Sequence, residues 1–261
     1  MKIIHLFLLL SALSCNKFIL KAERITPPST PAPLPREIIP FASYWLDANE
    51  VKTITEFRQG IPELSAGQQD CLSDQYPKIE TVRGSGHKVF RGERGRELSC
   101  HDIDLSFLSQ GQFTVYLAFV PTSSPRLLTL SAGTEIFSVF LMDKVLMVST
   151  GADMDYLSQH ADYTFKKNQI SLLKLVIDLN ETAPEDRQKI WINGASLPLV
   201  PQFIGSGTFS PDTSEVHLHS QSGTEISSLM IFDHILTQEQ ETQVNCYLSQ
   251  KLELNLANCQ G

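Results

Sequence analysis

The chain has 261 residues, of which 42% are hydrophobic and 19% are charged, and its net charge is −8. This length and apolar content can build one sizeable folded core in addition to a leader segment. The acidic balance argues against nucleic acid as a partner and against electrostatic docking on anionic lipid.

Residues 1–14 have the features of an export signal. Lys2 gives a basic start, and the mostly apolar run that follows is too short to span a bilayer as a stable helix. The run closes with Ala12-Leu13-Ser14-Cys15, which resembles a bacterial lipobox. That resemblance implies cleavage of a lipoprotein signal peptide (1–14), acylation at Cys15, and a lipid anchor in a membrane of a bacterial cell envelope, with the outer membrane or cell surface favoured. The alternative is an ordinary secretory signal with an incidental Cys15.

The cysteine count fits an exported chain. Five cysteines are an odd number, and lipidation of Cys15 leaves four, which can form two disulfides in an oxidising compartment: Cys71, Cys100, Cys246 and Cys259. Three pairings are open. We favour Cys71–Cys100 with Cys246–Cys259 because each pair closes a local loop. Zinc is a weaker alternative, since no two cysteines have the usual ligand spacing.

Residues 15–40 are interpreted as the lipidated cysteine followed by a proline-rich tether. This segment contains six prolines: Pro27, Pro28, Pro31, Pro33, Pro35 and Pro40. Such a run favours extended polyproline II and acts as a semi-rigid spacer. A disordered leader is the alternative. The remaining residues, 41–261, are expected to form one domain.

The pattern of this domain is that of β-structure. Residues 113–120 are apolar on both faces, which predicts a strand covered on both sides. Residues 170–178 alternate between apolar and polar side chains. Further strands are expected at 126–131, 135–142, 144–149, 189–192, 215–219 and 225–232, with turn signals such as Asn193-Gly194 between them. Many short strands at this spacing indicate a sandwich or a barrel.

One helix is expected at the end of the domain. Thr237 followed by Gln240 has the form of a capping box. Val244, Tyr247, Leu248 and Leu252 then recur at helical spacing and predict a single apolar stripe. We expect this stripe to pack on the sandwich edge.

Six segments, taken in order, resemble those of bacterial laminin-G-like domains with the concanavalin A-like lectin/glucanase fold: 43–48, 87–92, 113–121, 189–194, 226–236 and 237–254. The resemblance covers most of the domain. It implies an all-β, antiparallel jelly-roll sandwich with one C-terminal helix. It implies no single function, because this fold carries lectins, adhesion modules, glycan hydrolases and lyases.

The chain has no recognisable catalytic motif. The Glu-x-Asp-x-Glu strand of retaining glycosidases on this fold is absent, and the nearest pattern, Asp102-Ile-Asp104, is interpreted as a solvated turn. The Gly-x-Ser-x-Gly and His-Glu-x-x-His motifs are absent too. We therefore predict that the protein is not an enzyme.

Two patterns contain residues that can ligate metal. Glu215, His217 and His219 alternate along an expected strand and can project from one face, although a polar outer face explains them equally. Asp153 and Asp155 lie in an expected polar loop, 151–163, where the resemblance suggests calcium. Two aspartates do not complete a calcium shell, so calcium is a candidate cofactor without a full site.

Sugar binding needs aromatic platforms beside polar groups. Trp45 lies in an apolar strand and is interpreted as core. Trp191 stands between Ile190 and Ile192 and points opposite to them, so it is the leading candidate for ligand binding. Tyr156 and His160, in the expected loop, are further candidates.

The leading functional hypothesis is a membrane-anchored lipoprotein for binding or adhesion, with a glycan or an extracellular matrix protein as its partner. A structural or envelope-assembly lipoprotein without a small ligand is the first alternative. A glycan-active hydrolase or lyase, with carboxylates from non-adjacent strands, is the second. The ligand, the membrane leaflet and the oligomeric state stay open.

Overall fold

In the computed structural model the described residues all belong to one compact unit, 34–261. The described residues are 42–50, 78–82, 85–91, 98–101, 106–121, 126–132, 134–142, 144–151, 156–160, 163–166, 168–206, 215–218, 225–256 and 259. The expected signal peptide, Cys15 and the tether up to residue 40 lie outside these residues. No helix in the described ranges is long and apolar enough to cross a membrane.

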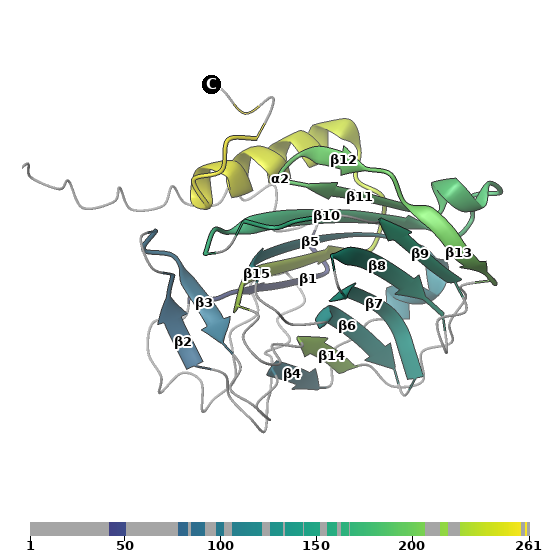
Figure 1. Ribbon diagram of the computed structural model, residues 1–261, viewed down its shortest axis with the longest axis horizontal. Helices are drawn as coiled ribbons and strands as arrows, with labels where there is room; N and C mark the ends of the chain where they lie inside the picture. The colour runs from purple at the N-terminus through teal and green to yellow at the C-terminus, as the bar shows by residue number, and fades with distance from the viewer. Residues whose placement is uncertain are drawn as a thin grey trace, which may run out of the picture. The chain divides into compact units, whose positions relative to one another are not determined.

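The described strands form two antiparallel sheets (Figure 1). The first sheet has eight: β1 (Tyr44–Asp47), β2 (Lys78–Thr81), β3 (Lys88–Arg91), β5 (Gln112–Val120), β10 (Ser171–Asp178), β11 (Gln188–Ile192), β12 (Ala195–Leu197) and β15 (Glu225–Phe232). Its order is β12-β11-β10-β5-β15-β3-β2. Strand β1 pairs with the second half of β15, whereas β3 pairs with its beginning.

The second sheet has seven described strands, in the order β13-β9-β8-β7-β6-β14-β4. In chain order they are β4 (Leu98–His101), β6 (Arg126–Ala132), β7 (Thr134–Met142), β8 (Val145–Thr150), β9 (Tyr156–His160), β13 (Val200–Ile204) and β14 (Glu215–Leu218). Two short 3-10 helices, η2 (Ser106–Gln110) and η4 (Pro184–Asp186), and the α-helix α2 (Gln238–Lys251) complete the described elements.

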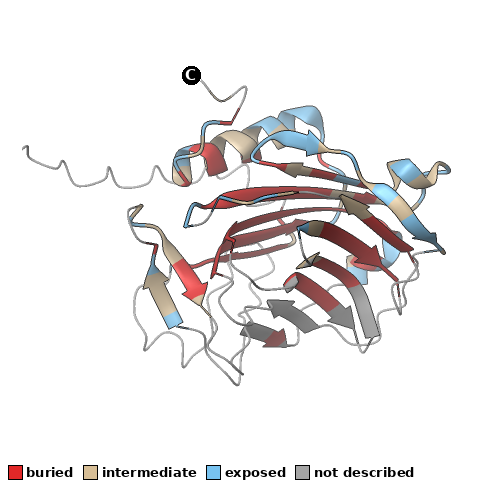
Figure 2. Cartoon of the chain, viewed as in Figure 1, coloured by how far each residue is buried: buried red, intermediate tan, exposed pale blue. Residues whose placement is uncertain are grey.

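The main core lies between the two sheets, and the alternation of side chains along β5 shows why. Phe113, Leu117 and Phe119 point into this core, where they meet residues of β7 and β8 such as Phe137 and Val148. Tyr116 and Val120 point the other way, into a second apolar cluster. Figure 2 shows β5, β10 and β15 as almost entirely buried. The prediction that residues 113–120 are covered on both sides is therefore confirmed.

Helix α2 provides the second cover. The capping box is present, with Thr237 Oγ1 accepting from the Gln240 backbone N–H at 3.3 Å and Gln240 Oε1 accepting from the Thr237 N–H at 2.9 Å. Val244, Leu248 and Leu252 are buried against the outer face of the first sheet. The helix thus lies across this face and not on an edge, because the apolar outer face of the central strands needs cover.

A disulfide secures the segment that follows the helix. Cys246 and Cys259 are bonded, with their Cα atoms 4.8 Å apart, as we expected. Within the tethered segment Leu256 is buried and lies beside Gly194 in the β11–β12 turn. Cys100 is also disulfide-bonded, while Cys71, its expected partner, lies outside the described residues.

Five strands occupy segments where no strand was expected: β2, β4, β9, β12 and β13. Strand β9 lies inside the expected loop 151–163, and β13 contains Pro201. Proline removes a donor and is tolerated on an edge strand, which is where β13 lies. The all-β antiparallel sandwich with one C-terminal helix is confirmed.

Candidate functional site

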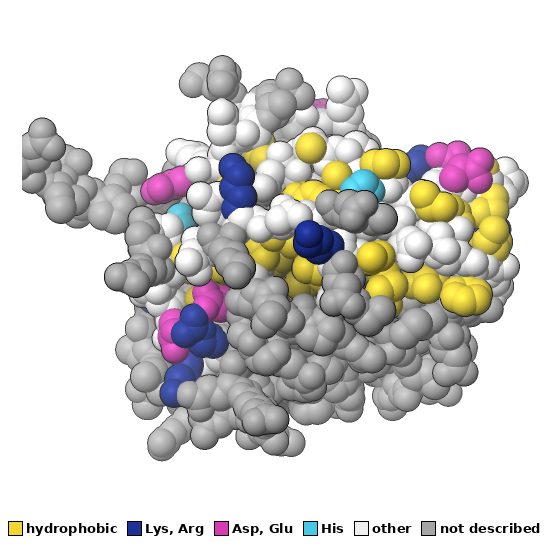
Figure 3. All heavy atoms as spheres, in the orientation of Figure 1, with side chains coloured by type: hydrophobic (Ala, Val, Ile, Leu, Met, Phe, Trp, Pro, Cys, Tyr) yellow, Lys and Arg dark blue, Asp and Glu magenta, His cyan; other side chains and the backbone are white. Residues whose placement is uncertain are grey.

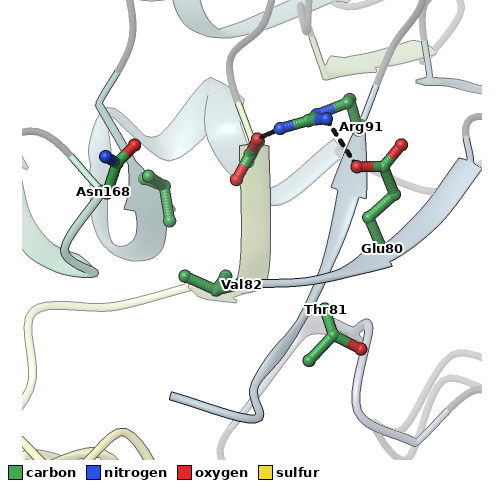
Figure 4. A pocket seen from close by; sticks show the side chains of 7 residues that line it. Glu80, Thr81, Val82, Arg91 and Asn168 are labelled. Carbon is green, nitrogen blue, oxygen red and sulfur yellow. Dashed lines mark hydrogen bonds and ion pairs between the residues drawn. The ribbon is translucent and has the colours of Figure 1, made fainter. Parts of the chain in front are cut away.

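The described residues line a pocket on the helix-facing side of the first sheet, where β2, β3, β5 and β15 come together. Its cavity of about 220 Å³ is lined by Glu80, Thr81, Val82, Arg91, Val120, Asn168 and Glu225. Val82 and Val120 belong to the apolar cluster that α2 covers elsewhere, and they give the pocket an apolar wall. Figure 4 shows Asn168 on the opposite side of the pocket from Glu80 and Arg91.

Strand register places the charged residues of the pocket. Arg91, at the end of β3, stands directly opposite Glu225 at the start of β15. Glu80 reaches the same guanidinium from β2. Arg91 Nη1 lies 2.5 Å from Glu80 Oε2, and Nη2 forms an ion pair with Glu225 Oε1. Charge-assisted pairs of this kind hold both carboxylates in defined positions.

The three charged side chains differ in exposure. The side chain of Glu225 is only 8% exposed, whereas those of Glu80 and Arg91 are 38% and 42% exposed. Figure 3 shows acidic and basic side chains gathered over β2 and β3, while hydrophobic side chains gather around β13 at the other end. The pocket is therefore a polar recess with one deep carboxylate and a half-exposed ionic rim.

One further hydrogen-bonding group belongs to the lining, the side-chain amide of Asn168. Asn168 has a φ of 58°, a conformation that asparagine adopts more readily than most residues. The cavity is smaller than the roughly 300–1,000 Å³ of pockets for drug-sized ligands, so its size suits one small polar ring.

Trp191 faces away from the main core, as the sequence predicted, since Ile190 and Ile192 are buried between the sheets. The ring is half-buried, and Lys174 Nζ lies 3.4 Å from its centroid. Glu241 of α2 holds that ammonium at 2.6 Å. Burial lowers the pKa of Lys174, and Glu241 offsets part of this effect. A cation–π contact therefore occupies one face of the ring, and Trp191 takes no part in the pocket.

Tyr156 and His160 lie on β9, in the second sheet. Tyr156 is fully buried and its hydroxyl donates to the carbonyl of Pro184, so its ring has no surface for a ligand. His160 is half-buried, with Nδ1 2.8 Å from the carbonyl oxygen of Pro198 and its ring against Tyr163. The structure brings neither residue to Trp191 or to the pocket.

The expected metal ligands fall mostly outside the described residues. Glu215 and His217 lie on β14, two positions apart and so at alternate positions of one strand, but their side chains are not described. His219, Asp153 and Asp155 are also outside. The described residues contain no group of three His, Cys, Asp or Glu that can hold a metal ion.

A second polar cluster joins β1 to the end of α2. Asp47 Oδ2 lies 2.5 Å from Lys251 Nζ, and the two side chains are 0% and 4% exposed. Burial opposes the charge of Lys251, but Asp47 and Tyr247 outweigh it and raise the pKa of this lysine. Burial raises the pKa of Tyr247 to about 12. Lys251 Nζ also donates to Tyr247 Oη at 3.0 Å, and the cluster thus fastens the helix to the sheet.

The sequence analysis did not single out the three charged residues of the pocket. Arg91 and Glu225 are 134 positions apart, and only the pairing of β3 with β15 joins them. One weak signal is present. Arg91 ends β3 directly after the buried Phe90, and Glu225 begins β15 directly before the buried Ile226, so each strand has a charged residue next to a core residue.

No protein-family model matches the chain, and no curated protein matches it in sequence. Its fold is similar to that of the binding domain of botulinum neurotoxin DC in complex with sialylT (TM-score 0.53, 8% identity, covering 82% of this chain and 52% of that chain). It is also similar to domain 4 of an extracellular arabinanase from Geobacillus stearothermophilus in complex with arabinotriose (TM-score 0.50, 16% identity, 76% and 95% covered). Trypanosoma rangeli sialidase is a third such structure (TM-score 0.51, 12% identity, 80% and 33% covered).

These likenesses define the class of fold. The two antiparallel sheets with a C-terminal helix form a concanavalin A-like β-sandwich. The chain spans about half the length of the neurotoxin domains that it resembles. At these identities the similarity concerns the fold, and function has to be argued from the pocket.

Proposed function

We propose that the protein is an exported lipoprotein that binds carbohydrate in the pocket formed by β2, β3, β5 and β15. The observation that carries this proposal is the pocket itself. Two carboxylates fixed by Arg91 and the amide of Asn168 surround a cavity of about 220 Å³ with an apolar wall. Sugar rings offer hydroxyl groups on their rim and C–H groups on their faces, and this lining matches both.

The similar folds support the same class of ligand. The neurotoxin binding domain is in complex with sialylT, and the arabinanase domain is in complex with arabinotriose. The arabinanase domain, 95% of which is covered by this chain, is thus a fold of this kind in complex with an oligosaccharide. The lipobox-like segment that ends at Cys15 supports the membrane anchor.

We propose binding without turnover. The pocket does bring two carboxylates together, as glycoside hydrolysis requires, but Arg91 forms an ion pair with each of them. Hydrolysis is therefore the second candidate function. Chromatography of any bound oligosaccharide after long incubation distinguishes the two, since shortened products would appear only with an enzyme.

A glycan array probed with the full chain tests the binding proposal. We expect at least one class of glycan to bind, and Asn168→Gly and Glu80→Ala each to weaken that binding about tenfold or more. Glycine keeps the positive φ at residue 168, and Glu80 is half-exposed, so the melting temperature should change little.

Glu181→Ala is the matched control, because Glu181 is an exposed glutamate in a turn outside the pocket. An array without binding, or pocket variants that bind as the parent does, would contradict the proposal.

A further inference from the structure

The charge balance of the pocket points to a subclass of ligand. We infer that the pocket selects neutral sugars and amino sugars and rejects acidic sugars. This inference rests on the proposed function and adds to it the chemistry that the pocket distinguishes.

The only guanidinium in the described lining is already engaged. Arg91 Nη1 is directed to Glu80 and Nη2 to Glu225, and Figure 4 shows dashed contacts on both sides of the arginine. Arginine recognises a carboxylate through two parallel N–H donors, and here these donors serve two carboxylates of the chain itself. The arginine is thus not available to a carboxylate of the ligand in the usual two-point mode.

The described lining also carries excess negative charge. It contains two carboxylates and one guanidinium, and the other lining residues are uncharged. Glu225 is almost fully buried, so water and salt screen its charge only weakly. A ligand anion at about 5 Å from the Glu225 carboxylate would be repelled, whereas an ammonium group at the same place would be attracted.

The free acceptors favour the same ligands. Each carboxylate accepts from Arg91 through one of its oxygens and keeps acceptor capacity for donors from a ligand. Sugar hydroxyls and ammonium groups are donors, whereas a uronate or sialate carboxylate is only an acceptor. Recognition by this pocket therefore differs in charge from recognition of a sialylated ligand.

Matched monosaccharide triplets test the inference. The full chain is applied to immobilised glycans that end in glucose, glucosamine or glucuronate, and likewise in the galactose and mannose series. Within the series that binds, we expect the neutral and amino members to bind at least about tenfold more tightly than the uronate, equivalent to about 1.4 kcal/mol. The preference for the amino sugar should shrink as salt concentration rises.

A charge variant gives a second readout. Glu80→Gln keeps the shape of the rim and removes one negative charge. It should therefore reduce the difference in affinity between the amino sugar and the uronate of a series. Glu181→Gln makes the same change outside the pocket and should leave this difference in affinity as it is in the parent.

The two proposals fail in different ways. Two results would overturn the charge selectivity and leave carbohydrate binding in place. One is a uronate that binds as tightly as the neutral sugar of its series, and the other is a difference in affinity between amino sugar and uronate that Glu80→Gln does not change. Failure of every triplet to bind, with a blank array, would overturn both.

Discussion

The ion pair between Asp47 and Lys251 is the most enclosed charged contact among the described residues of this sandwich. Removing two charges from water costs several kcal/mol per ion, and only their attraction and additional hydrogen bonds compensate for it. Asn49 provides such bonds to Asp47 Oδ1, at 2.8 Å from its backbone N–H and 3.1 Å from its side chain. Breaking one half of this pair leaves an uncompensated buried charge.

We therefore predict that Lys251→Met or Asp47→Asn alone lowers the free energy of unfolding by about 3–5 kcal/mol. The double variant should lose clearly less than the sum of the two single variants, since neither charge then remains buried alone. Urea unfolding of the four proteins measures the coupling.

The exposed pair Asp186 and Lys189, 3.1 Å apart, is the matched control and should contribute about 0–1 kcal/mol. Additive losses at Asp47 and Lys251 would show that the two groups do not stabilise each other.

At the scale of elements, α2 holds its place by a cap at one end, the ion pair at the other and the Cys246–Cys259 disulfide behind it. The disulfide closes a short loop of sequence separation 13 and retains the segment that carries Leu256. Such a cross-link stabilises mainly by restricting the unfolded chain.

The double variant Cys246→Ser/Cys259→Ser is predicted to lose about 3 kcal/mol of stability. Thermal unfolding without reductant measures this loss, and peptide mapping of the unreduced parent should recover the Cys246–Cys259 link. A parent that alkylates at Cys259 without reductant would contradict the prediction.

The sequence predicted elements whose signals are local. The capping box at Thr237 and the doubly apolar strand at 113–120 both appear where their patterns lie, because neighbouring residues are sufficient to define them. Strand β9 was missed because its buried polar residue, Ser158, hides the apolar character of the segment. The pocket was missed for a different reason. A period of two shows which face a residue occupies, but it does not show which strand lies beside it.

Trp191 shows the same limit. The alternation along β11 correctly predicted that its ring leaves the main core. It could not predict that Lys174 of β10, its cross-strand partner, would cover the ring, or that Glu241 of a helix distant in sequence would hold that lysine.

At the scale of the whole molecule, the proposed anchor decides where the pocket operates. If Cys15 carries acyl chains, each buried methylene contributes about 0.8 kcal/mol to membrane binding. We predict that Cys15→Ser moves the protein from the membrane fraction to the soluble fraction, as measured by detergent phase partitioning. A variant that partitions as the parent does would exclude the lipid anchor.

The position of β15 affects how the protein can fold during its synthesis. This strand lies between β5 on one side and β1 and β3 on the other, yet it begins only at Glu225. A ribosome that has reached residue 224 has therefore made β1, β3 and β5 but not the strand that joins them. Until β15 emerges, one long apolar edge of β5 is open to chaperones, and such non-local pairing is slow to form. Glu225 belongs to that same strand, so the pocket cannot be complete before β15 has joined the sheet.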